Sequence, residues 1–90
     1  MAIRFIRNIQ FTRLIKVDGR LKEFNFRKLM NQGEEKCSVD TVDERGNRII
    51  FTITKENGSW KLAPALIPGW IVEYEKQLHE AIEDELSNHP

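Results

Sequence analysis

The chain has 90 residues, enough for one domain with a single hydrophobic core but too few for two domains that each bury a core. Hydrophobic residues make up 40% of the composition and charged residues 31%, with only three prolines and five glycines. This is the composition of an ordinary globular protein and argues against disorder except at the chain ends. The formal net charge is zero, so the chain as a whole is attracted neither to nucleic acid nor to an anionic membrane.

The first predicted unit is a β-hairpin. Hydrophobic and polar residues alternate over residues 9–17, which predicts a strand, and residues 21–30 form the expected second strand. Asp18-Gly19 between them is a turn signal. A two-residue loop would pair Phe11 with Phe26, whereas a bulged three-residue loop would shift the pairing by one residue. The sequence leaves both registers open.

A third strand is predicted over residues 36–42, followed by a loop that ends at Gly46. A three-residue hairpin loop favours glycine at its last position, where the backbone is left-handed. With this loop the third strand pairs with a fourth strand over residues 48–55. The expected pairs are Cys37 with Ile53 and Val39 with Phe51.

The strongest hairpin signal is Asn57-Gly58, which lies between the strands predicted over residues 48–55 and 59–64. A two-residue loop at this dipeptide sets the pairs Lys55 with Trp60, Ile53 with Leu62, and Phe51 with Pro64. Turn chemistry and alternation then agree on one buried face. Its members are Ile49, Phe51, Ile53, Trp60 and Leu62.

Two prolines end the last strand, since proline cannot donate to a ladder, and an amphipathic helix is predicted over residues 69–86. Its apolar stripe consists of Ile71, Tyr74, Leu78, Ala81, Ile82 and Leu86. The predicted fold class is therefore α+β. We expect a single domain over residues 1–90, in which an antiparallel β-meander of four to five strands carries one C-terminal amphipathic α-helix packed on one face of the sheet.

The single cysteine excludes an internal disulfide and suits a reducing compartment. Residues 1–8 fit a frayed strand or a short helical turn equally well, and they carry scattered charges instead of the uninterrupted apolar core of a signal peptide. No stretch approaches the ~20 apolar residues of a membrane span. We therefore expect a soluble cytoplasmic protein without a membrane partner.

No known catalytic or cofactor-binding motif is present, so we expect no enzyme activity and no cofactor. His79 and Glu75 are four residues apart on the predicted helix, but two ligands are fewer than a structural zinc site needs, and we expect no metal. Cys37 belongs to the predicted buried face, which indicates a core residue and not a nucleophile. Asp40 and Asp43 flank a turn, where carboxylates commonly bond to the backbone.

The first functional hypothesis is a non-enzymatic binding or protein-interaction module. Its expected contact surface is the apolar connection from Pro64 to Trp70, the start of the helix and an edge strand, because tryptophan is enriched where interfaces bind most strongly. The proposed binding residues are Leu66, Ile67, Trp70 and Tyr74. The alternative is that these side chains close the end of the core. The expected partner is another protein or a second copy, which could pair with an unguarded sheet edge.

The second hypothesis is a nucleic-acid-binding domain. Residues 1–28 carry eight basic and two acidic residues, whereas residues 70–86 carry six acidic residues and one lysine. The basic residues proposed to contact phosphates are Arg13, Lys16, Arg20, Lys22, Arg27 and Lys28. Phe11, Phe24 and Phe26 lie among them and could stack on bases, or could belong to the core. A small-ligand carrier or enzyme, with a pocket between sheet and helix, is the third hypothesis.

Overall fold

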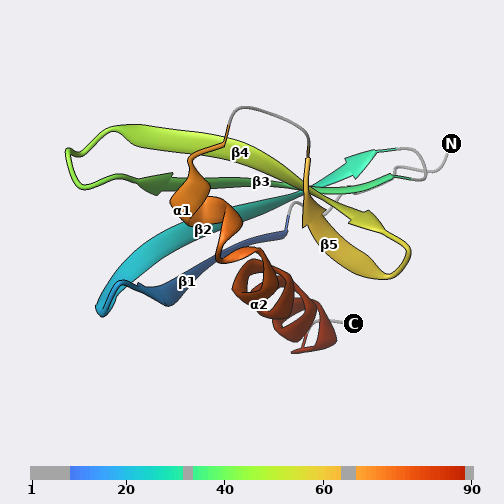
Figure 1. The fold of residues 1–90 in the computed structure, drawn as a ribbon. Coiled ribbons are helices and arrows are strands. Elements are labelled where there is room, and N and C mark those ends of the chain that lie inside the picture. The colour runs from blue at the N-terminus through green and yellow to red at the C-terminus, as the bar shows by residue number, and fades with distance from the viewer. Residues whose placement is uncertain (1–8, 32–33, 64–66, 89–90) are drawn as a thin grey trace, which may run out of the picture.

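The computed structural model describes residues 9–31, 34–63 and 67–88. It confirms the predicted fold class: five strands in sequential order form one antiparallel sheet, which curls into a half-barrel with a helix packed across its open side (Figure 1). The elements are β1 (Ile9–Val17), β2 (Arg20–Asn31), β3 (Glu34–Val42), β4 (Arg48–Glu56), β5 (Ser59–Leu62), α1 (Gly69–Val72) and α2 (Glu75–Asn88).

Two tight turns set the register of the first and last hairpins, β1–β2 and β4–β5. Asp18 and Gly19 have φ values of 49° and 80°, and Asn57 and Gly58 have φ values of 50° and 82°. Positive φ at both central residues defines the two-residue turn whose twist matches that of the flanking strands. Phe11 therefore pairs with Phe26, which decides between the two registers that the sequence left open.

The loop between β3 and β4 is organised by one carboxylate. Asp43 Oδ1 accepts hydrogen bonds from the backbone N–H groups of Arg45, at 2.9 Å, and Asn47, at 2.8 Å. The bond from Asn47 is the main reason why the pKa of Asp43 lies below its usual value. Gly46 has the left-handed φ of 83° that a three-residue loop requires. The predicted pairing of Val39 with Phe51 is confirmed.

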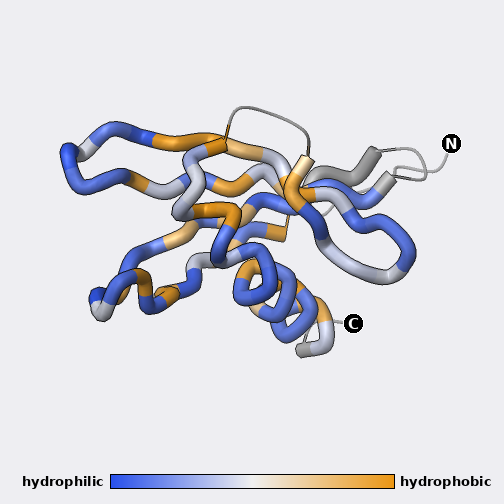
Figure 2. Tube along the Cα trace, viewed as in Figure 1, coloured by the Kyte–Doolittle hydropathy of each residue, from blue (hydrophilic) through white to orange (hydrophobic). Residues whose placement is uncertain are grey.

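The core lies between the concave face of the sheet and the two helices. The largest fully buried side chains come from both layers: Trp60, Phe24, Phe26, Ile53, Ile71, Leu78, Ile82, Val39 and Cys37. The predicted inner face of the β4–β5 hairpin is confirmed, since Phe51, Ile53 and Trp60 are buried and Ile49 and Leu62 pack against them. The turns from β3 to β4 and from β4 to β5 are hydrophilic, as Figure 2 shows.

The single helix predicted over residues 69–86 is wrong in one respect, because the chain turns between α1 and α2 at Glu73 and Tyr74. The backbone N–H of Tyr74 donates to the carbonyl oxygen of Ile71 at 2.9 Å, a tighter turn than an α-helix makes. Ile71 in α1 and Leu78 in α2 are both fully buried. None of the helices in the described ranges is long and apolar enough to cross a membrane.

Strand ends differ from the prediction by one or two residues. β3 begins at Glu34, two residues early, and β5 ends at Leu62, two residues early. Ala63 N–H still donates to the carbonyl oxygen of Thr52 at 3.0 Å, so the pairing continues for one bond beyond the strand. The predicted pair of Phe51 with Pro64 lies outside the described residues.

Cys37 is fully buried, and burial raises the pKa of its thiol from 9.0 to about 11. Because the thiolate is the nucleophile, raising the pKa of the thiol from 9.0 to about 11 leaves about 100-fold less thiolate at pH 8. We expect native protein to react with iodoacetamide at least about 100-fold more slowly than denatured protein at pH 8.

The same shift has a defined effect on stability. Between pH 9 and 11 the unfolded thiol loses a proton that the folded thiol keeps, so the unfolding free energy should fall as the pH rises through this window. The Cys37→Ala variant should lack this contribution.

In the alkylation experiment, equal rates for native and denatured wild-type protein would contradict the buried placement of Cys37.

Candidate protein-interaction surface

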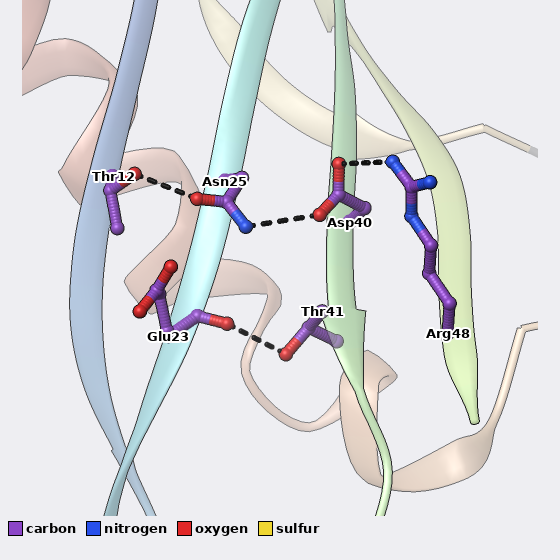
Figure 3. Close-up of polar contacts among 6 residues, drawn as sticks. All are labelled: Thr12, Glu23, Asn25, Asp40, Thr41 and Arg48. Carbon is purple, nitrogen blue, oxygen red and sulfur yellow. Dashed lines mark hydrogen bonds and ion pairs between the residues drawn. The ribbon is translucent and has the colours of Figure 1, made fainter. Parts of the chain in front are cut away.

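A hydrogen-bonded polar ladder crosses four strands on the outer face, which we define as the side of β1 to β4 that points away from the core. Thr12 Oγ1 donates to Asn25 Oδ1 at 2.7 Å, and Asn25 Nδ2 donates to Asp40 Oδ1 at 3.0 Å. Arg48 Nη2 donates to Asp40 Oδ2 at 3.2 Å (Figure 3). The ladder follows from register, because Thr12 pairs with Asn25 and Asn25 pairs with Asp40.

Both carboxylate oxygens of Asp40 accept a hydrogen bond in this ladder. The carboxylate is therefore held between an amide and a guanidinium. A polar group that already has its partners is less costly to remove from water than one without partners. The ladder can accordingly be covered by another surface.

Exposed aliphatic residues lie beside the ladder, one on each of β1 to β4. The exposed fractions are 61% for Leu14, 68% for Leu21, 49% for Val42 and 61% for Ile50. Leu14 lies opposite Glu23, two residues from Leu21, so the two leucines are diagonal neighbours across β1 and β2. Val42 and Ile50 are diagonal neighbours across β3 and β4, since Val42 lies opposite Arg48. We call these the leucine pair and the β3–β4 pair.

Two hollows shape the outer face. The first, of about 470 Å³, lies over the ladder. Residues of all four strands line it: Gln10, Phe11, Thr12, Asn25, Phe26, Arg27, Ser38, Asp40, Arg48 and Ile50. The second, of about 730 Å³, lies where β2 and β3 separate, and Leu21 and Val42 line it.

Side chains bridge the separation between β2 and β3. Thr41 Oγ1 donates to the carbonyl oxygen of Glu23 at 2.8 Å (Figure 3), and Lys22 Nζ donates to the carbonyl oxygen of Val42 at 2.9 Å. These bonds hold the two hairpins at a fixed opening where backbone pairing has ended.

The residues predicted to form the first binding site pack mostly against the core. Trp70 makes an edge-to-face contact with Phe24 at a centroid distance of 6.3 Å, and Lys22 Nζ lies 4.5 Å from the centre of its ring. The hydroxyl of Tyr74 accepts a hydrogen bond from the backbone N–H of Asp18 at 3.2 Å. Ile67 also packs on the core, and Leu66 lies outside the described residues. A role of this region in binding stays a prediction.

The structure does not bring the six predicted phosphate-binding residues together. Arg13 lies on the inner face, where its guanidinium donates hydrogen bonds to the carboxylates of Asp84 at 2.9 Å and Glu85 at 3.0 Å. These two bonds, that to Asp84 most, raise the pKa of Arg13. Lys28 pairs with Glu35 at 3.5 Å, and Lys22 contacts Trp70. Lys16 and Arg27 are on the outer face and Arg20 adjoins the first turn.

The phenylalanines interleaved with these basic residues belong to the core side of the sheet. Phe24 and Phe26 are buried, and Phe11 stacks on Phe26 at a centroid distance of 4.7 Å. Their rings are therefore not displayed beside Lys16 and Arg27 for stacking on bases.

His79 and Glu75 bond to the free edge of the sheet. His79 Nδ1 accepts from the backbone N–H of Trp60 at 2.9 Å, and Glu75 Oε2 accepts from that of Leu62 at 2.8 Å. Two acceptor side chains that are four residues apart on α2 thus reach backbone N–H groups that are two residues apart on β5. This edge was expected to be unguarded, and α2 covers it.

Within residues 9–31, 34–63 and 67–88, no group of three His, Cys, Asp or Glu side chains could hold a metal.

The sequence interpretation missed the outer face because Leu14 and Arg13 blurred the alternation of β1. The usable signal was the presence of Leu14, Leu21, Val42 and Ile50 at the strand positions otherwise occupied by polar residues. Searches of protein families, of curated proteins and of solved structures found no significant match to this chain.

Proposed function

We propose that the chain is a non-enzymatic protein-interaction module whose contact surface is the outer face. One observation carries this proposal: four large aliphatic side chains are exposed on a single face of the sheet, one from each of β1 to β4. A cluster of exposed apolar residues bordered by polar groups is typical of a protein-binding site. The four residues are Leu14, Leu21, Val42 and Ile50.

The polar ladder supports the same function. Its hydroxyl, amide, carboxylate and guanidinium groups bond to one another, so a partner could cover the face without leaving these bonds unmade. The hollow above the ladder is polar and open, unlike the mostly apolar clefts that enclose small molecules. These features favour a protein partner over a small ligand.

The placement of the reactive groups supports a non-enzymatic role. Cys37 is buried with a raised pKa, and Asp40 is engaged by Asn25 and Arg48. Nucleic-acid binding is the weaker alternative, because Arg13 and Lys28 are engaged in ion pairs and only Lys16 and Arg27 of the six proposed residues point from the outer face.

Site-specific photo-crosslinking tests the contact surface. Benzoylphenylalanine would replace Ile50 on the outer face or, as a control, Gln77 on the exposed side of α2. In purified protein and in extract of the cells that make it, we expect discrete adducts from position 50. They should be lost when Leu14 and Leu21 are both changed to serine. The absence of adducts at position 50, or the same adducts from position 77, would contradict the proposal.

A further inference from the structure

We infer that the gap between β2 and β3 binds an extended segment of a partner protein, which pairs with β2 as an additional strand and carries a basic residue beside aliphatic ones. This inference rests on the proposed function and adds the place of binding and the chemistry of the partner. The gap lies between two hairpins, β1–β2 and β3–β4, which diverge toward their turns (Figure 1). We call it the inter-hairpin gap.

β2 has an open edge in the inter-hairpin gap. Its pairing with β3 ends where Asn25 lies opposite Asp40, although β2 itself begins at Arg20. Residues 20–24 therefore pair with β1 on one side and with no described strand on the other. An unpaired strand edge is a template for the addition of another strand.

Three backbone groups on this edge point into the gap. The carbonyl oxygen of Glu23 accepts a hydrogen bond from Thr41 of β3 at 2.8 Å, so the backbone of Glu23 faces β3. This direction repeats at every second residue of a strand, so the backbone of Leu21 faces the same way. Within the described ranges, no backbone group of β3 bonds to the N–H of Glu23 or to either group of Leu21. An added antiparallel strand can exchange two hydrogen bonds with Leu21 and accept a third from Glu23.

The gap has an apolar rim and an aromatic floor. On the outer side it forms the hollow of about 730 Å³, and its rim carries Leu21 of β2, which is 68% exposed, and Val42 of β3, which is 49% exposed. On the inner side a hollow of about 340 Å³ has Trp70 of α1 in its lining. Both hollows are lined by Val17, Asp18, Lys22, Asp43 and Glu44. Successive side chains of a strand point to opposite faces, so an inserted segment places alternate side chains beside Leu21 and Val42 and the others toward Trp70.

The charges around the gap favour a basic residue in the partner. Carboxylates outnumber basic groups in the lining of the outer hollow, which contains Asp18, Glu23, Asp43 and Glu44 against Arg20 and Lys22. Lys22 already donates to a carbonyl oxygen of β3, and Asp43 accepts hydrogen bonds from its own loop. Among the described residues, the carboxylates of Asp18, Glu23 and Glu44 form no ion pair. A lysine or arginine of the segment would be attracted to them.

Peptide selection tests this inference. A phage-displayed library of random dodecapeptides, selected on the purified chain, supplies the probe. We expect the enriched peptides to combine alternating aliphatic residues with a lysine or arginine. When such a peptide binds, hydrogen exchange at the Leu21 and Glu23 amides should slow at least about tenfold, because both N–H groups gain a partner.

Variants at the rim locate the site. Leu21→Ser and Val42→Ser should each weaken peptide binding at least about tenfold. Val72→Ser is the matched control, because Val72 is an aliphatic residue of α1 that is 52% exposed and lies away from the gap. It should leave the affinity unchanged. All three sites are exposed, and the amide spectrum of each variant would verify its fold.

The charge of the partner is tested separately. Replacing both Glu23 and Glu44 by glutamine should weaken binding and reduce its dependence on salt, because exposed charges are screened by ions. Glu80→Gln, on the exposed side of α2, should do neither. Equal salt dependence of the wild type and the double variant would contradict a basic residue at this site.

A selection that enriches no peptide would overturn the inference, as would peptides that bind without slowing exchange at Leu21 and Glu23. Peptides that lose affinity on Leu14→Ser or Ile50→Ser, but not on Val42→Ser, would exclude the gap and leave the proposed function standing. If no peptide binds and position 50 yields no crosslinked adducts in extract, both conclusions fail.

Discussion

Leu78→Ala is expected to lower the unfolding free energy by about 2–5 kcal/mol, the usual range for truncating a buried leucine. Leu78 is fully buried, and α2 closes the open side of the half-barrel through its contacts with β5 and β1. Removing its side chain leaves a cavity where helix and sheet meet. Urea unfolding, followed both by far-ultraviolet circular dichroism and by tryptophan fluorescence, measures the change.

Gln77→Ala is the matched control, because Gln77 is the exposed neighbour of Leu78 on the same helix. It should change stability by no more than about 0.5 kcal/mol. Ile82→Val provides a milder probe if Leu78→Ala does not fold, since Ile82 is also fully buried and this change typically costs about 0.5–1.5 kcal/mol. Equal stabilities of Leu78→Ala and Gln77→Ala would show that α2 does not pack as described.

His79→Ala and Glu75→Ala are each expected to destabilise the protein by about 1–3 kcal/mol, the cost of leaving a partly buried donor without its partner. The two donors are the backbone N–H groups of Trp60 and Leu62, both in part-buried hydrogen bonds. β5 has four residues and lies at the edge of the sheet, so α2 supplies the acceptors that a sixth strand would otherwise provide.

Hydrogen exchange at the Trp60 and Leu62 amides measures this directly, and exchange should be faster in the alanine variants. His79→Asn and Glu75→Gln are the controls, because each keeps an acceptor oxygen near the lost atom. Unchanged exchange at Trp60 in His79→Ala would refute the role of the imidazole.

The hairpins were predictable because their registers depend on neighbours in sequence. Asn57-Gly58 adopts the positive φ values of a tight turn whatever surrounds it, and strand pairing then follows residue by residue. The loop at Gly46 behaved in the same way. For Asp18-Gly19 the dipeptide alone allowed two loop lengths, and packing of Phe11 on Phe26 accompanies the one observed.

The turn between α1 and α2 was not predictable, because its causes are distant in sequence. The apolar stripe runs through Tyr74 without interruption, so local periodicity favours one helix. Tyr74 instead bonds to Asp18, 56 residues away, while His79 and Glu75 bond to β5. The positions of Asp18 and β5 relative to the two helices depend on how the sheet curls, which the local sequence pattern does not reveal.

The interaction surface was missed for the same reason. Leu14 and Arg13 are adjacent, and the sequence offers no reason why the leucine points to solvent and the arginine points inward. The structure supplies it: Arg13 meets Asp84 and Glu85 of α2, more than 70 residues later, and Leu14 is left on the outer face.

From the sequence alone came an antiparallel meander of four to five strands in chain order, the registers at Asn57-Gly58 and Gly46, and an amphipathic C-terminal helix, because turn chemistry and periodicity act over a few residues. The structure decided that there are five strands. Tertiary structure alone decided where the helix turns, which residue faces inward in β1, and how the edge of β5 is satisfied. Each of these depends on groups that are far apart in the chain and meet only when the sheet curls around its core.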